Sequence, residues 1–368
     1  MIKDKLKIGI LGTRGIPNYH GGFEQFAEFF SVYLAQQNHE VYVYNSNKHP
    51  FQEKTFKGVN IIHCYDPEDK IGTPGQFIYD LNCILDSRKR NFDILLQLGY
   101  TSSTIWYKLL PKKPIIITNM DGLEWKRSKY SKKVQKFLKY AERLGVKSSD
   151  FLVADSIGIQ NYLKETYGVN SKYIAYGAEQ FKTPNSKALS EYNVQPYSYN
   201  MLIARLEPEN NIETILDGVA LATSKSPFLV VGKHDVNAFG KHLKNKFKNH
   251  KNIRFVGGIY DLNALNNLRY YSNLYFHGHS VGGTNPSLLE AMSSKAFIIA
   301  NDNQFNKSIL NNNALYFKTP QHVKDCLDNI DKKEHLDKVE NCFNDIEKYF
   351  SWNIINNAYL NFFYECKK

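Results

Sequence analysis

The feature that most constrains the fold is an alternation of short apolar strands with amphipathic helices, which occurs twice along the chain. A strand–helix–strand order of this kind implies a parallel, doubly wound sheet. In the first series, β-branched and aromatic runs predict strands at residues 5–11, 40–44, 61–64, 94–98 and 114–118. The spacing of apolar residues predicts a helix at residues 23–36, between the first two strands.

The second series has the same organisation. We expect strands at residues 199–204, 228–232, 253–256, 274–277 and 296–300, and helices at residues 211–222, 262–271 and 286–293. A polar stretch without a strand, residues 182–196, is the predicted linker. The sequence thus predicts two α/β domains, residues 1–182 and 197–349, which suits a length of 368 residues. The aromatic-rich segment 350–366 has helical spacing and could pack across either half.

The chain is strongly basic, with 47 lysines and arginines against 36 acidic residues and a net charge of +11. Nucleic acid, an anionic membrane surface or phosphorylated substrates would each suit this charge. We find no nucleic-acid-binding motif and expect no nucleic-acid partner. The excess is concentrated in residues 126–147 and 233–251. A solvated helix face would also explain either cluster.

The cysteines indicate a reducing compartment. The five are Cys64, Cys83, Cys326, Cys342 and Cys366. Their odd number, wide spacing and lack of a CxxC pair favour neither a disulfide framework nor a zinc site. The N-terminus runs directly into a strand without a signal-cleavage pattern, and no apolar run approaches the roughly 20 residues of a membrane-spanning helix. We therefore expect a cytoplasmic protein.

A glycine turn between a strand and a helix gives the strongest functional signal. The run HGHSVGGTNPSLLEAM, residues 277–292, contains a glycine pair, two N-cap residue types and a helix-opening proline: Gly282, Gly283, Thr284, Asn285 and Pro286. Unpaired backbone N–H groups and the helix dipole at such a start favour an anion. Glu290, about one turn inside the helix, could accept hydrogen bonds from sugar hydroxyls. These residues indicate a sugar phosphate ligand, although an ordinary strand-to-helix turn has the same pattern.

The first glycine-rich loop has two interpretations. Gly9, Gly12 and Gly15 imitate a dinucleotide fingerprint, but the acid expected after the second strand is replaced by Asn45. The pair Gly21 and Gly22 precedes the helix at residue 23 and forms a second phosphate-compatible helix start. The alternative is a loop whose glycines are needed for positive φ.

Other candidate residues follow later strands. Arg205 ends a strand and could hold a diphosphate bidentately, or be a surface arginine. Asp121 is a candidate for accepting a hydroxyl proton, and the indole of Trp125 could support a sugar ring. A capping aspartate and a structural tryptophan are the alternatives.

A basic, amphipathic helix follows this loop. Its apolar stripe comprises Val134, Phe137, Leu138, Ala141 and Leu144, with most of the neighbouring lysines off the stripe. The helix could lie on anionic lipid, or its stripe could be ordinary core. The nearby His277 and His279 lack the further ligands that a metal site requires, so we expect no metal and no cofactor.

Six motifs follow one another along the chain: GTRGIPNYHGGFE, DGLEWKR, ADS, YGAE, ARLEPEN and HSVGGTNPSLLEAM. Together they resemble the retaining GT-B glycosyltransferases of family-4 type, and more narrowly bacterial rhamnosyltransferases of capsule and cell-wall polysaccharide assembly. The resemblance implies two Rossmann-like doubly wound parallel-sheet domains of the α/β class that face each other across a cleft. Residues 1–182 would be the acceptor-side domain, with helix 350–366 packed back on it, and residues 197–349 would bind the nucleotide sugar.

The resemblance also implies roles for individual residues. Arg205 would bind the diphosphate and stabilise its charge, and Asp121 would orient the acceptor. The nucleobase would lie near residues 257–260. The donor as a whole would contact nine residues of both domains: Gly21, Gly22, Asn210, Gly257, Tyr260, Gly283, Thr284, Asn285 and Glu290. We expect the acceptor to contact four residues of the first domain: Tyr19, His20, Glu124 and Trp125.

The chain departs from the family pattern at three positions. The family motif has two glutamates eight positions apart, and Gly282 replaces the first, which typically contacts sugar hydroxyls. Asn210 stands where the family has a lysine, and Asp121 stands near a position that is a histidine in many relatives. The missing glutamate makes a donor that is not glucose-like more plausible.

The expected function is transfer of L-rhamnose from dTDP-rhamnose, or another sugar from a dTDP- or UDP-sugar, to a polyprenyl-diphosphate-linked saccharide. The enzyme would work without a metal, in peripheral contact with the anionic inner face of the cell membrane. Two alternatives are a non-hydrolysing nucleotide-sugar 2-epimerase, which shares the two-domain plan, and a non-enzymatic polyanion-binding protein.

Overall fold

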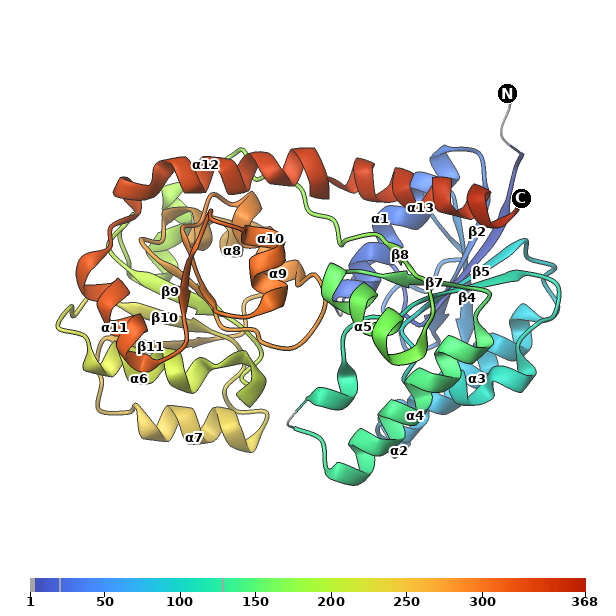
Figure 1. Ribbon diagram of the computed structural model, residues 1–368, viewed down its shortest axis with the longest axis horizontal. Coiled ribbons are helices and arrows are strands. Elements are labelled where there is room, and N and C mark those ends of the chain that lie inside the picture. Colours follow the sequence, from blue (N-terminus) through green and yellow to red (C-terminus); the bar gives the residue numbers. More distant parts are fainter. Residues whose placement is uncertain (1–3, 20, 128) are drawn as a thin grey trace. The chain divides into compact units, whose positions relative to one another are not determined.

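A computed structural model of the chain describes residues 4–19, 21–127 and 129–368, which form two compact units. The first unit contains the chain up to Lys126, Tyr130–Tyr176 and Trp352–Lys368. The second unit contains Gly177–Ser351 together with Arg127 and Lys129. Figure 1 labels the elements of both units. Each unit is built on one sheet, as the two strand series predict.

The sheet of the first unit has the order β3-β4-β2-β1-β5-β6-β7-β8. Its strands are β1 (Lys7–Leu11), β2 (Glu40–Ser46), β3 (Thr55–Phe56), β4 (Val59–Cys64), β5 (Ile94–Leu98), β6 (Ile115–Asn119), β7 (Phe151–Ala154) and β8 (Lys172–Tyr173). All neighbours pair in parallel except β3 and β4. In the centre, Ile8 lies between Val41 and Ile94. The sequence predicted five of these strands within two residues at each end.

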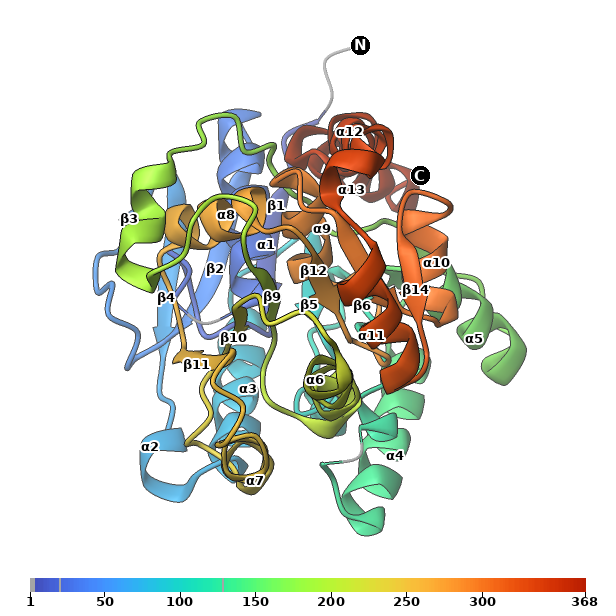
Figure 2. The ribbon, with the colours of Figure 1, turned by 90° about the vertical axis from the view of Figure 1, so that its left-hand side faces the viewer.

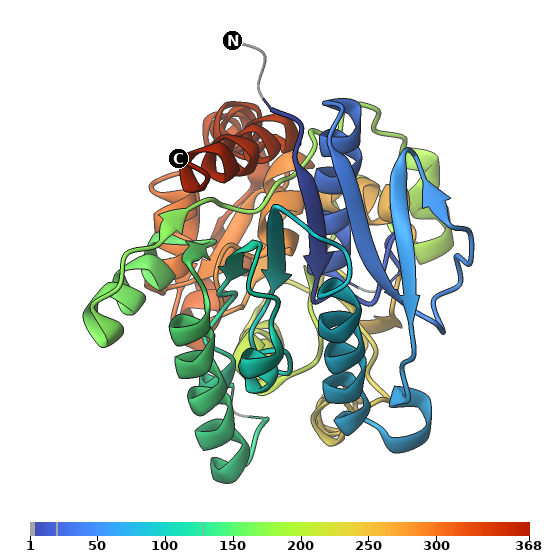
Figure 3. The same cartoon turned by 90° about the vertical axis from the view of Figure 1, so that its right-hand side faces the viewer.

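Helices cover both faces of this sheet. They are α1 (Gly22–Gln36), α2 (Glu68–Ile71), α3 (Pro74–Ser87), α4 (Lys132–Ser148), α5 (Ile157–Tyr167) and α13 (Trp352–Cys366), with the 3-10 helices η1 (Thr104–Leu109) and η2 (Glu124–Lys126). Because strand side chains alternate, Leu95 packs with Tyr79 and Cys83 of α3 while its neighbours face the other side. Figure 3 shows α3 (blue) and α4 (green) on the near face.

The C-terminal helix α13 packs on α1 within the first unit. Trp352 stacks on Phe29 with ring centroids 4.5 Å apart and planes at 4°. Tyr359 lies 4.7 Å from Phe26, and the hydroxyl of Tyr33 donates to Asn357 at 2.7 Å. This aromatic seam explains why the aromatic residues of the last segment recur at helical spacing.

The sheet of the second unit is parallel throughout, in the order β11-β10-β9-β12-β13-β14. Its strands are β9 (Asn200–Ile203), β10 (Phe228–Val231), β11 (Ile253–Gly257), β12 (Tyr275–His277), β13 (Ile298–Asn301) and β14 (Leu315–Phe317). The order reverses between β9 and β12, and ligands of open α/β sheets bind at the carboxyl ends of strands at such a switch point. The predicted donor-binding residues of this unit follow these strands.

Seven α-helices surround this sheet, with four short helical turns, among the described residues. They are α6 (Ile212–Leu221), α7 (Ala238–Lys246), α8 (Leu262–Tyr271), α9 (Pro286–Ser293), α10 (Gln304–Leu310), α11 (Pro320–Asn329) and α12 (Leu336–Asp345), with η3 (Ser186–Tyr192), η4 (Pro208–Asn210), η5 (Lys332–His335) and the π-turn η6 (Ile346–Phe350). Figure 2 shows α6 and α11 side by side. Gly218 allows this contact, since a Cβ there would lie 2.5 Å from Val323.

The predicted linker at residues 182–196 is wrong. The second unit already begins at Gly177, and the stretch contains η3, whose Leu189 is buried. The backbone of Asn185 donates to the amide oxygen of Asn267 on α8 at 2.6 Å, which attaches the stretch to the unit. Its polar composition suggested exposed chain, but one buried leucine and this long-range hydrogen bond hold it in place.

In the described residues, we find no helix that is long and apolar enough to cross a membrane.

Candidate functional site

The second-unit site begins with the alternation of side chains along β12. Phe276 points into the main apolar core, so Tyr275 and His277 lie on the opposite face. The Tyr275 hydroxyl lies 3.1 Å from the Ser287 hydroxyl of α9. The polar face of β12 is therefore covered by α9, the helix of the glycine-turn motif.

The loop after β12 is fixed against η4. A Cβ on Gly278 would lie 2.0 Å from the carbonyl oxygen of Asn210, so only glycine fits there. The amide of Asn211 donates to the Gly278 carbonyl at 2.8 Å, and the Ser280 hydroxyl donates to the Glu209 carbonyl at 2.7 Å. These contacts bring the ARLEPEN and HSVGGTNP motifs together, although 67 residues separate Asn211 from Gly278.

The start of α9 has the predicted form. Asn285 is the N-cap, and its side chain accepts a hydrogen bond from the backbone of Ser287 at 2.9 Å. Pro286 occupies the first turn, and Thr284 is buried just before it. Since the first backbone N–H groups of a helix have no partner within it, this start can hold an anion.

Glu290 has a partner that the sequence did not reveal. Its carboxylate lies 2.6 Å from the guanidinium of Arg269, whose side chain is 1% exposed against 24% for Glu290. Oε2 is the oxygen bonded to Arg269, so Oε1 is the oxygen that this ion pair leaves for another donor. Arg269 lies in α8, and no local pattern marks it as the neighbour of a residue 21 positions away.

Arg205 is exposed after β9, and the surrounding loop holds its backbone. The Arg205 carbonyl accepts hydrogen bonds from the Asn210 amide at 2.7 Å and from the Glu207 backbone at 2.8 Å. Asn210 is buried and holds the backbone of Arg205. Its expected contact with the donor stays a prediction.

The residues expected near the nucleobase lie at the carboxyl ends of β10 and β11. Gly257 has a φ of +79°, and the side chain of Tyr260 is 77% exposed. The Lys233 ammonium lies 5.3 Å from the centroid of the Tyr260 ring. Because β10 and β11 pair in parallel, these groups share one edge of the sheet.

Gly282 has a physical reason for being glycine. Its φ is +136°, a conformation that side-chain-bearing residues rarely adopt, and a Cβ there would meet no atom within 4 Å. Backbone conformation, rather than lack of space, therefore disfavours the glutamate of the family pattern at this position.

Two histidines, the buried His277 and the partly buried His279, line the polar face of β12 and its loop. The rings of His277 and His279 stack with centroids 4.4 Å apart and planes at 16°. Burial and the neighbouring His279 hold the pKa of His277 well below its usual value. Burial and the guanidinium groups of Arg205 and Arg127 lower the pKa of His279 to about 3. Both imidazoles are therefore neutral at physiological pH.

In the first unit, the glycines of the opening loop are required by packing. Gly12 has a φ of +89°, and a Cβ would lie 2.2 Å from the Leu98 carbonyl oxygen. Gly15 has a φ of +128°, and a Cβ would lie 2.4 Å from Asn45. The Asn45 amide in turn bonds both backbone groups of Ile16. Gly12 and Gly15, which imitate a dinucleotide fingerprint, are thus needed for the conformation and packing of this loop.

The glycine pair before α1 has a different geometry. Gly21 is the N-cap in extended conformation, with a φ of −175°, and Gly22 opens the helix. A Cβ on Gly21 would only touch Glu24 at 3.5 Å, so neither positive φ nor crowding requires glycine there. The carboxylate of Glu24 is buried and accepts from the Arg14 backbone at 2.9 Å. The alternative interpretation, that positive φ requires the glycines of this loop, is wrong for Gly21.

Asp121 follows β6 with a φ of +50°, which aspartate tolerates better than most residues. Its backbone donates to the Asn119 side chain at 2.9 Å. The Asn119 amide donates to the Tyr359 hydroxyl of α13, also at 2.9 Å. The C-terminal helix therefore takes part in holding Asp121 at the sheet edge.

Trp125 belongs to a polar cluster around the carboxylate of Glu142, which is 2% exposed. The indole N–H of Trp125 and the ammonium of Lys139 donate to this carboxylate at 3.0 and 2.9 Å. Three tyrosine hydroxyls also donate to it: Tyr100, Tyr162 and Tyr167. The Lys139 ammonium lies 4.5 Å from the Trp125 ring centroid. The indole is thus held by the fold, and sequence spacing did not single out Glu142.

The remaining acceptor-side expectations concern the opening loop and η2. Tyr19 is 59% exposed, with its ring 5.4 Å from that of His49. Glu124 opens η2. The predicted acceptor residue His20 lies outside the described residues.

A buried carboxylate in α3 was not anticipated from the sequence. Asp80 is 7% exposed and accepts a hydrogen bond from the Ser102 hydroxyl at 2.5 Å. Burial raises its pKa from 3.8 to about 6, against the opposing effect of Ser102 and Arg14. Shifted carboxylates of this kind are frequent at functional sites. The only sequence signal is an acid on the core side of a helix.

The α4 stripe divides between core and surface. Leu138, Ala141 and Leu144 are buried, as the core interpretation predicted. Val134 and Phe137 are 39% and 37% exposed, and Tyr140 on the same side is 55% exposed. Three exposed lysines surround the start of the helix: Lys132, Lys133 and Lys136. The first half of α4 is therefore an apolar and basic surface.

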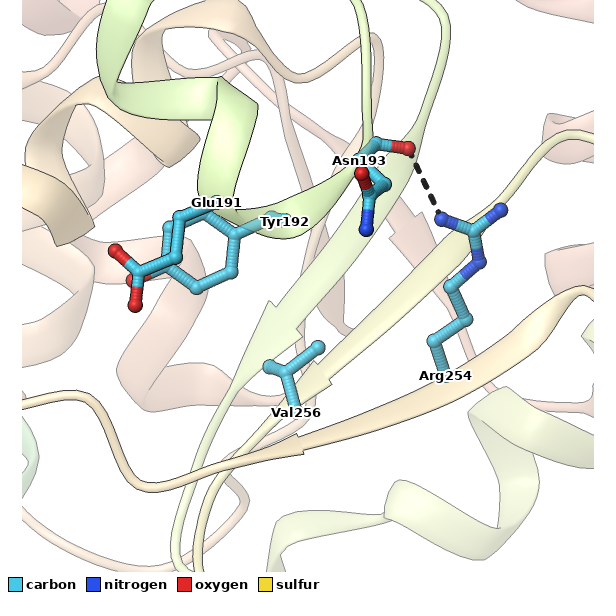
Figure 4. Close-up of a pocket in the computed structure, with 5 residues that line it drawn as sticks. All are labelled: Glu191, Tyr192, Asn193, Arg254 and Val256. Carbon is cyan, nitrogen blue, oxygen red and sulfur yellow. Dashed lines mark hydrogen bonds between the residues drawn. The ribbon is translucent and has the colours of Figure 1, made fainter.

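A pocket of about 580 Å³ lies at the edge of the second sheet, between η3 and β11 (Figure 4). Arg254 at its rim donates to the Asn193 carbonyl at 3.1 Å. Arg254 is the second residue of β11, toward the amino end of the strand. The pocket contains none of the predicted site residues.

Comparisons with known proteins agree with this geometry. Residues 195–348 match the family described as glycosyl transferases group 1, and residues 5–179 match a domain of unknown function, DUF1972. A protein of Methanocaldococcus jannaschii, described as an uncharacterized glycosyltransferase, is 24% identical over 378 residues, which is 95% of each chain.

Solved structures share the fold over nearly the whole chain. Sucrose-phosphate synthase from Thermosynechococcus elongatus has a TM-score of 0.78 at 13% identity, and the match covers 98% of this chain and 99% of that chain. HepE of Anabaena, in complex with UDP and glucose, has a TM-score of 0.75 at 15% identity, covering 98% and 100%. The chain therefore has the two parallel-sheet α/β units of the GT-B fold.

The class of protein is thus a glycosyltransferase. Residues 195–348, which match the group 1 model, contain the β12–α9 motif described above.

Proposed function

We propose that the chain is a retaining glycosyltransferase that takes its sugar from a nucleoside diphosphate sugar. The observation that carries this proposal is the convergence of Arg205, the α9 start and Glu290 at the carboxyl edge of one sheet. An arginine and a helix N-terminus suit a diphosphate. The Glu290 carboxylate binds Arg269 through Oε2, and its Oε1 suits a ribose hydroxyl. HepE, which shares the fold, was crystallised with UDP and glucose.

The proposed mechanism needs no metal. As the bond between the sugar and the diphosphate breaks, negative charge accumulates on the leaving diphosphate. Arg205 and the backbone N–H groups at the start of α9 stabilise that charge, and preorganised groups of this kind often supply the largest part of catalysis. The departing phosphate then takes the proton of the acceptor hydroxyl on the same face of the sugar. Asp121 orients the acceptor.

The proposed donor is dTDP-rhamnose. The motif resemblance to rhamnosyltransferases supports this choice, and so does Gly282, whose conformation disfavours the glutamate of the family pattern. We further propose that the nucleobase lies beside Gly257 and Tyr260, and that the backbone of Gly21 and Gly22 approaches a phosphate. Gly21 supports the last point because neither its φ nor its neighbours require glycine.

The activity test uses substitution of Arg205. Incubating the purified chain with dTDP-rhamnose and a polyprenyl-diphosphate-linked saccharide should release dTDP, while incubation without the acceptor should convert no donor. Arg205→Ala should lower kcat at least 100-fold, because loss of one group that stabilises transition-state charge costs about 3–4 kcal/mol. The matched control is Arg254→Ala, an arginine of the same sheet near the amino end of β11.

Three outcomes would contradict the proposal. Wild-type turnover in Arg205→Ala would remove the assigned role of that residue. Conversion of the donor without an acceptor would indicate an epimerase. Complete loss of turnover on addition of EDTA would refute the metal-independent mechanism.

We also propose that the acceptor is lipid-linked and that α4 brings the enzyme to an anionic membrane. The exposed side chains of Val134, Phe137 and Tyr140 could enter the headgroup region while the surrounding lysines meet anionic lipid. Each lysine near such a surface contributes about 1 kcal/mol of attraction. The net charge of +11 adds to this attraction.

Vesicle flotation tests the α4 surface. The wild type should float with phosphatidylglycerol vesicles and not with phosphatidylcholine vesicles. The triple variant Lys132→Glu, Lys133→Glu and Lys136→Glu should lose most of this binding. The matched control changes three exposed lysines in and just after α7 instead: Lys241→Glu, Lys244→Glu and Lys248→Glu. Equal loss in both triple variants would show that net charge, rather than α4, drives binding.

A further inference from the structure

The stacked pair of His277 and His279 has no role in the mechanism above. His277 lies on the face of β12 that α9 covers, and the charge of Arg205 acts on His279. Both Nδ1 and Nε2 of His277, and Nδ1 of His279, are buried without a hydrogen-bond partner among the described residues. Leaving one buried polar atom without a partner is costly, and here three such atoms lie together. Such a cluster calls for a ligand or another explanation.

The ring of His279 stacks on the ring of His277. The backbone of His279 is held separately, because its carbonyl oxygen accepts hydrogen bonds from the amides of Asn303 and Asn306 at 3.0 and 3.1 Å. The residues on both sides, Gly278 and Ser280, are fixed against η4 by the contacts described above. A side chain that is fixed before a ligand arrives gives a selective contact at low entropic cost.

The chemistry of His279 suits a neutral partner. With its pKa near 3, the imidazole carries no charge and offers one donor nitrogen and one acceptor nitrogen. Such a ring adds no charge to bind a phosphate, which Arg205 and the α9 start already suit. A sugar hydroxyl is both a donor and an acceptor, and it matches a neutral imidazole.

The position of His279 in the loop supports the same conclusion. It precedes Gly282 by three residues, and Gly282 stands where the family pattern that this chain resembles has a glutamate that typically contacts sugar hydroxyls. That contact is absent from this chain because the backbone at Gly282 disfavours a side chain. His279 is a polar side chain of the same loop, on a backbone that hydrogen bonds hold.

We infer that His279 is a specificity-determining residue that hydrogen-bonds a hydroxyl of the transferred sugar, with His277 as the ring against which it stacks. This inference rests on the proposed function, because it assumes that a nucleotide sugar is bound in the second unit. The ligand class is a neutral hexose on a nucleoside diphosphate. The nucleoside diphosphate alone should not depend on His279.

Calorimetric titration with and without the sugar tests the inference. The probes are dTDP, dTDP-rhamnose, UDP and UDP-glucose, and the variants are His279→Leu and His279→Gln. His279→Leu should weaken binding of the preferred nucleotide sugar about tenfold, the effect of one lost hydrogen bond, while changing affinity for the matching nucleoside diphosphate less than twofold. His279→Gln, which keeps a neutral donor and acceptor, should restore part of the loss. His242→Ala, an exposed histidine on α7, is the control.

The outcomes separate this inference from the proposed function. If the wild type binds no nucleotide sugar, the proposed function and this inference both fail. If it binds one and His279→Leu binds it equally well, only the inference is overturned. Equal weakening for the nucleotide sugar and the nucleoside diphosphate would show a structural role and also overturn it. Should His279→Leu fail to fold, the same comparison is made with His279→Phe, which keeps a stacked ring and removes both nitrogens. A loss confined to the sugar-bearing ligand then supports the inference, and an equal or absent loss refutes it.

Discussion

At the scale of single residues, Glu290 has a structural partner in addition to the ligand role that we propose for it. The spacing of its motif predicts a carboxylate that binds a sugar hydroxyl, and that role stays a prediction. The structure adds Arg269, a fully buried cation whose charge Glu290 neutralises at 2.6 Å. A substitution at Glu290 alone would therefore mix loss of a ligand contact with loss of stability.

A double substitution can separate these two roles. Glu290→Ala should destabilise the second unit by about 3–5 kcal/mol, because it leaves Arg269 buried without a counter-ion. Arg269→Met with Glu290→Ala removes both charges and should recover most of that stability. Nucleotide affinity should stay low in the double variant. Urea unfolding and calorimetric titration measure the two properties, and wild-type affinity in the double variant would show that Glu290 is purely structural.

Asp80 provides a pH-dependent prediction. Its folded pKa of about 6 exceeds the ordinary value of 3.8, so the folded state binds more protons between these values. The stability associated with this carboxyl is fully present below pH 4 and is lost as the pH rises to about 6. Asp80→Asn removes the cost of the buried charge and should stabilise the protein by about 1–3 kcal/mol at pH 7.

The comparison for Asp80 is made at two pH values. The amide oxygen that Asp80→Asn introduces can still accept from Ser102, so the variant keeps that hydrogen bond. At pH 4 the urea midpoints of wild type and Asp80→Asn should coincide, since the wild-type carboxyl is then protonated. A stability difference that is the same at pH 4 and pH 7 would contradict the shifted pKa.

At the scale of elements, local sequence patterns predicted the start of α9 and five strands of the first sheet. They left open whether the apolar stripe of α4 is core or surface. Asn285 and Pro286 act within one helical turn, so the sequence alone indicates where that helix begins. The α4 stripe could not be assigned to core or surface, because periodicity identifies an apolar face without showing what covers it. The structure shows that η1 and the Glu142 cluster cover only its second half.

The Glu142 cluster predicts a stability effect within α4. Five donors from four segments meet at this one buried carboxylate, including the indole of Trp125 and the ammonium of Lys139. Glu142→Ala should lower the free energy of unfolding by about 3–5 kcal/mol, since it leaves a cation and four polar groups without their acceptor. Thermal unfolding measures this effect, with Glu165→Ala on the exposed face of α5 as the control. Equal small shifts in both variants would refute the assigned role.

At the scale of the whole molecule, each unit has its own sheet and core, and the C-terminal helix belongs to the first unit although it follows the second in sequence. A ligand that binds only the folded second unit should stabilise the protein by about 4 kcal/mol at a thousandfold excess over its dissociation constant. In a thermal-shift panel of dTDP, UDP, GDP and their sugars, the cognate nucleotide should therefore raise the melting temperature of the protein. Absence of any shift across the panel would contradict nucleotide binding.

The sequence by itself determined the two series of parallel strands, the capped start of α9 and the class of enzyme that the motifs resemble. These features depend on side-chain periodicity and on contacts within a few residues, which are readable along the chain. Only the tertiary structure decided that residues 182–196 belong to the second unit, that Arg269 neutralises Glu290, and that Glu142 gathers donors from distant segments. It also showed that Asp80 is buried and that the two histidines stack on each other. Burial and long-range pairing depend on which surfaces meet after folding, and the local spacing of residues does not encode them.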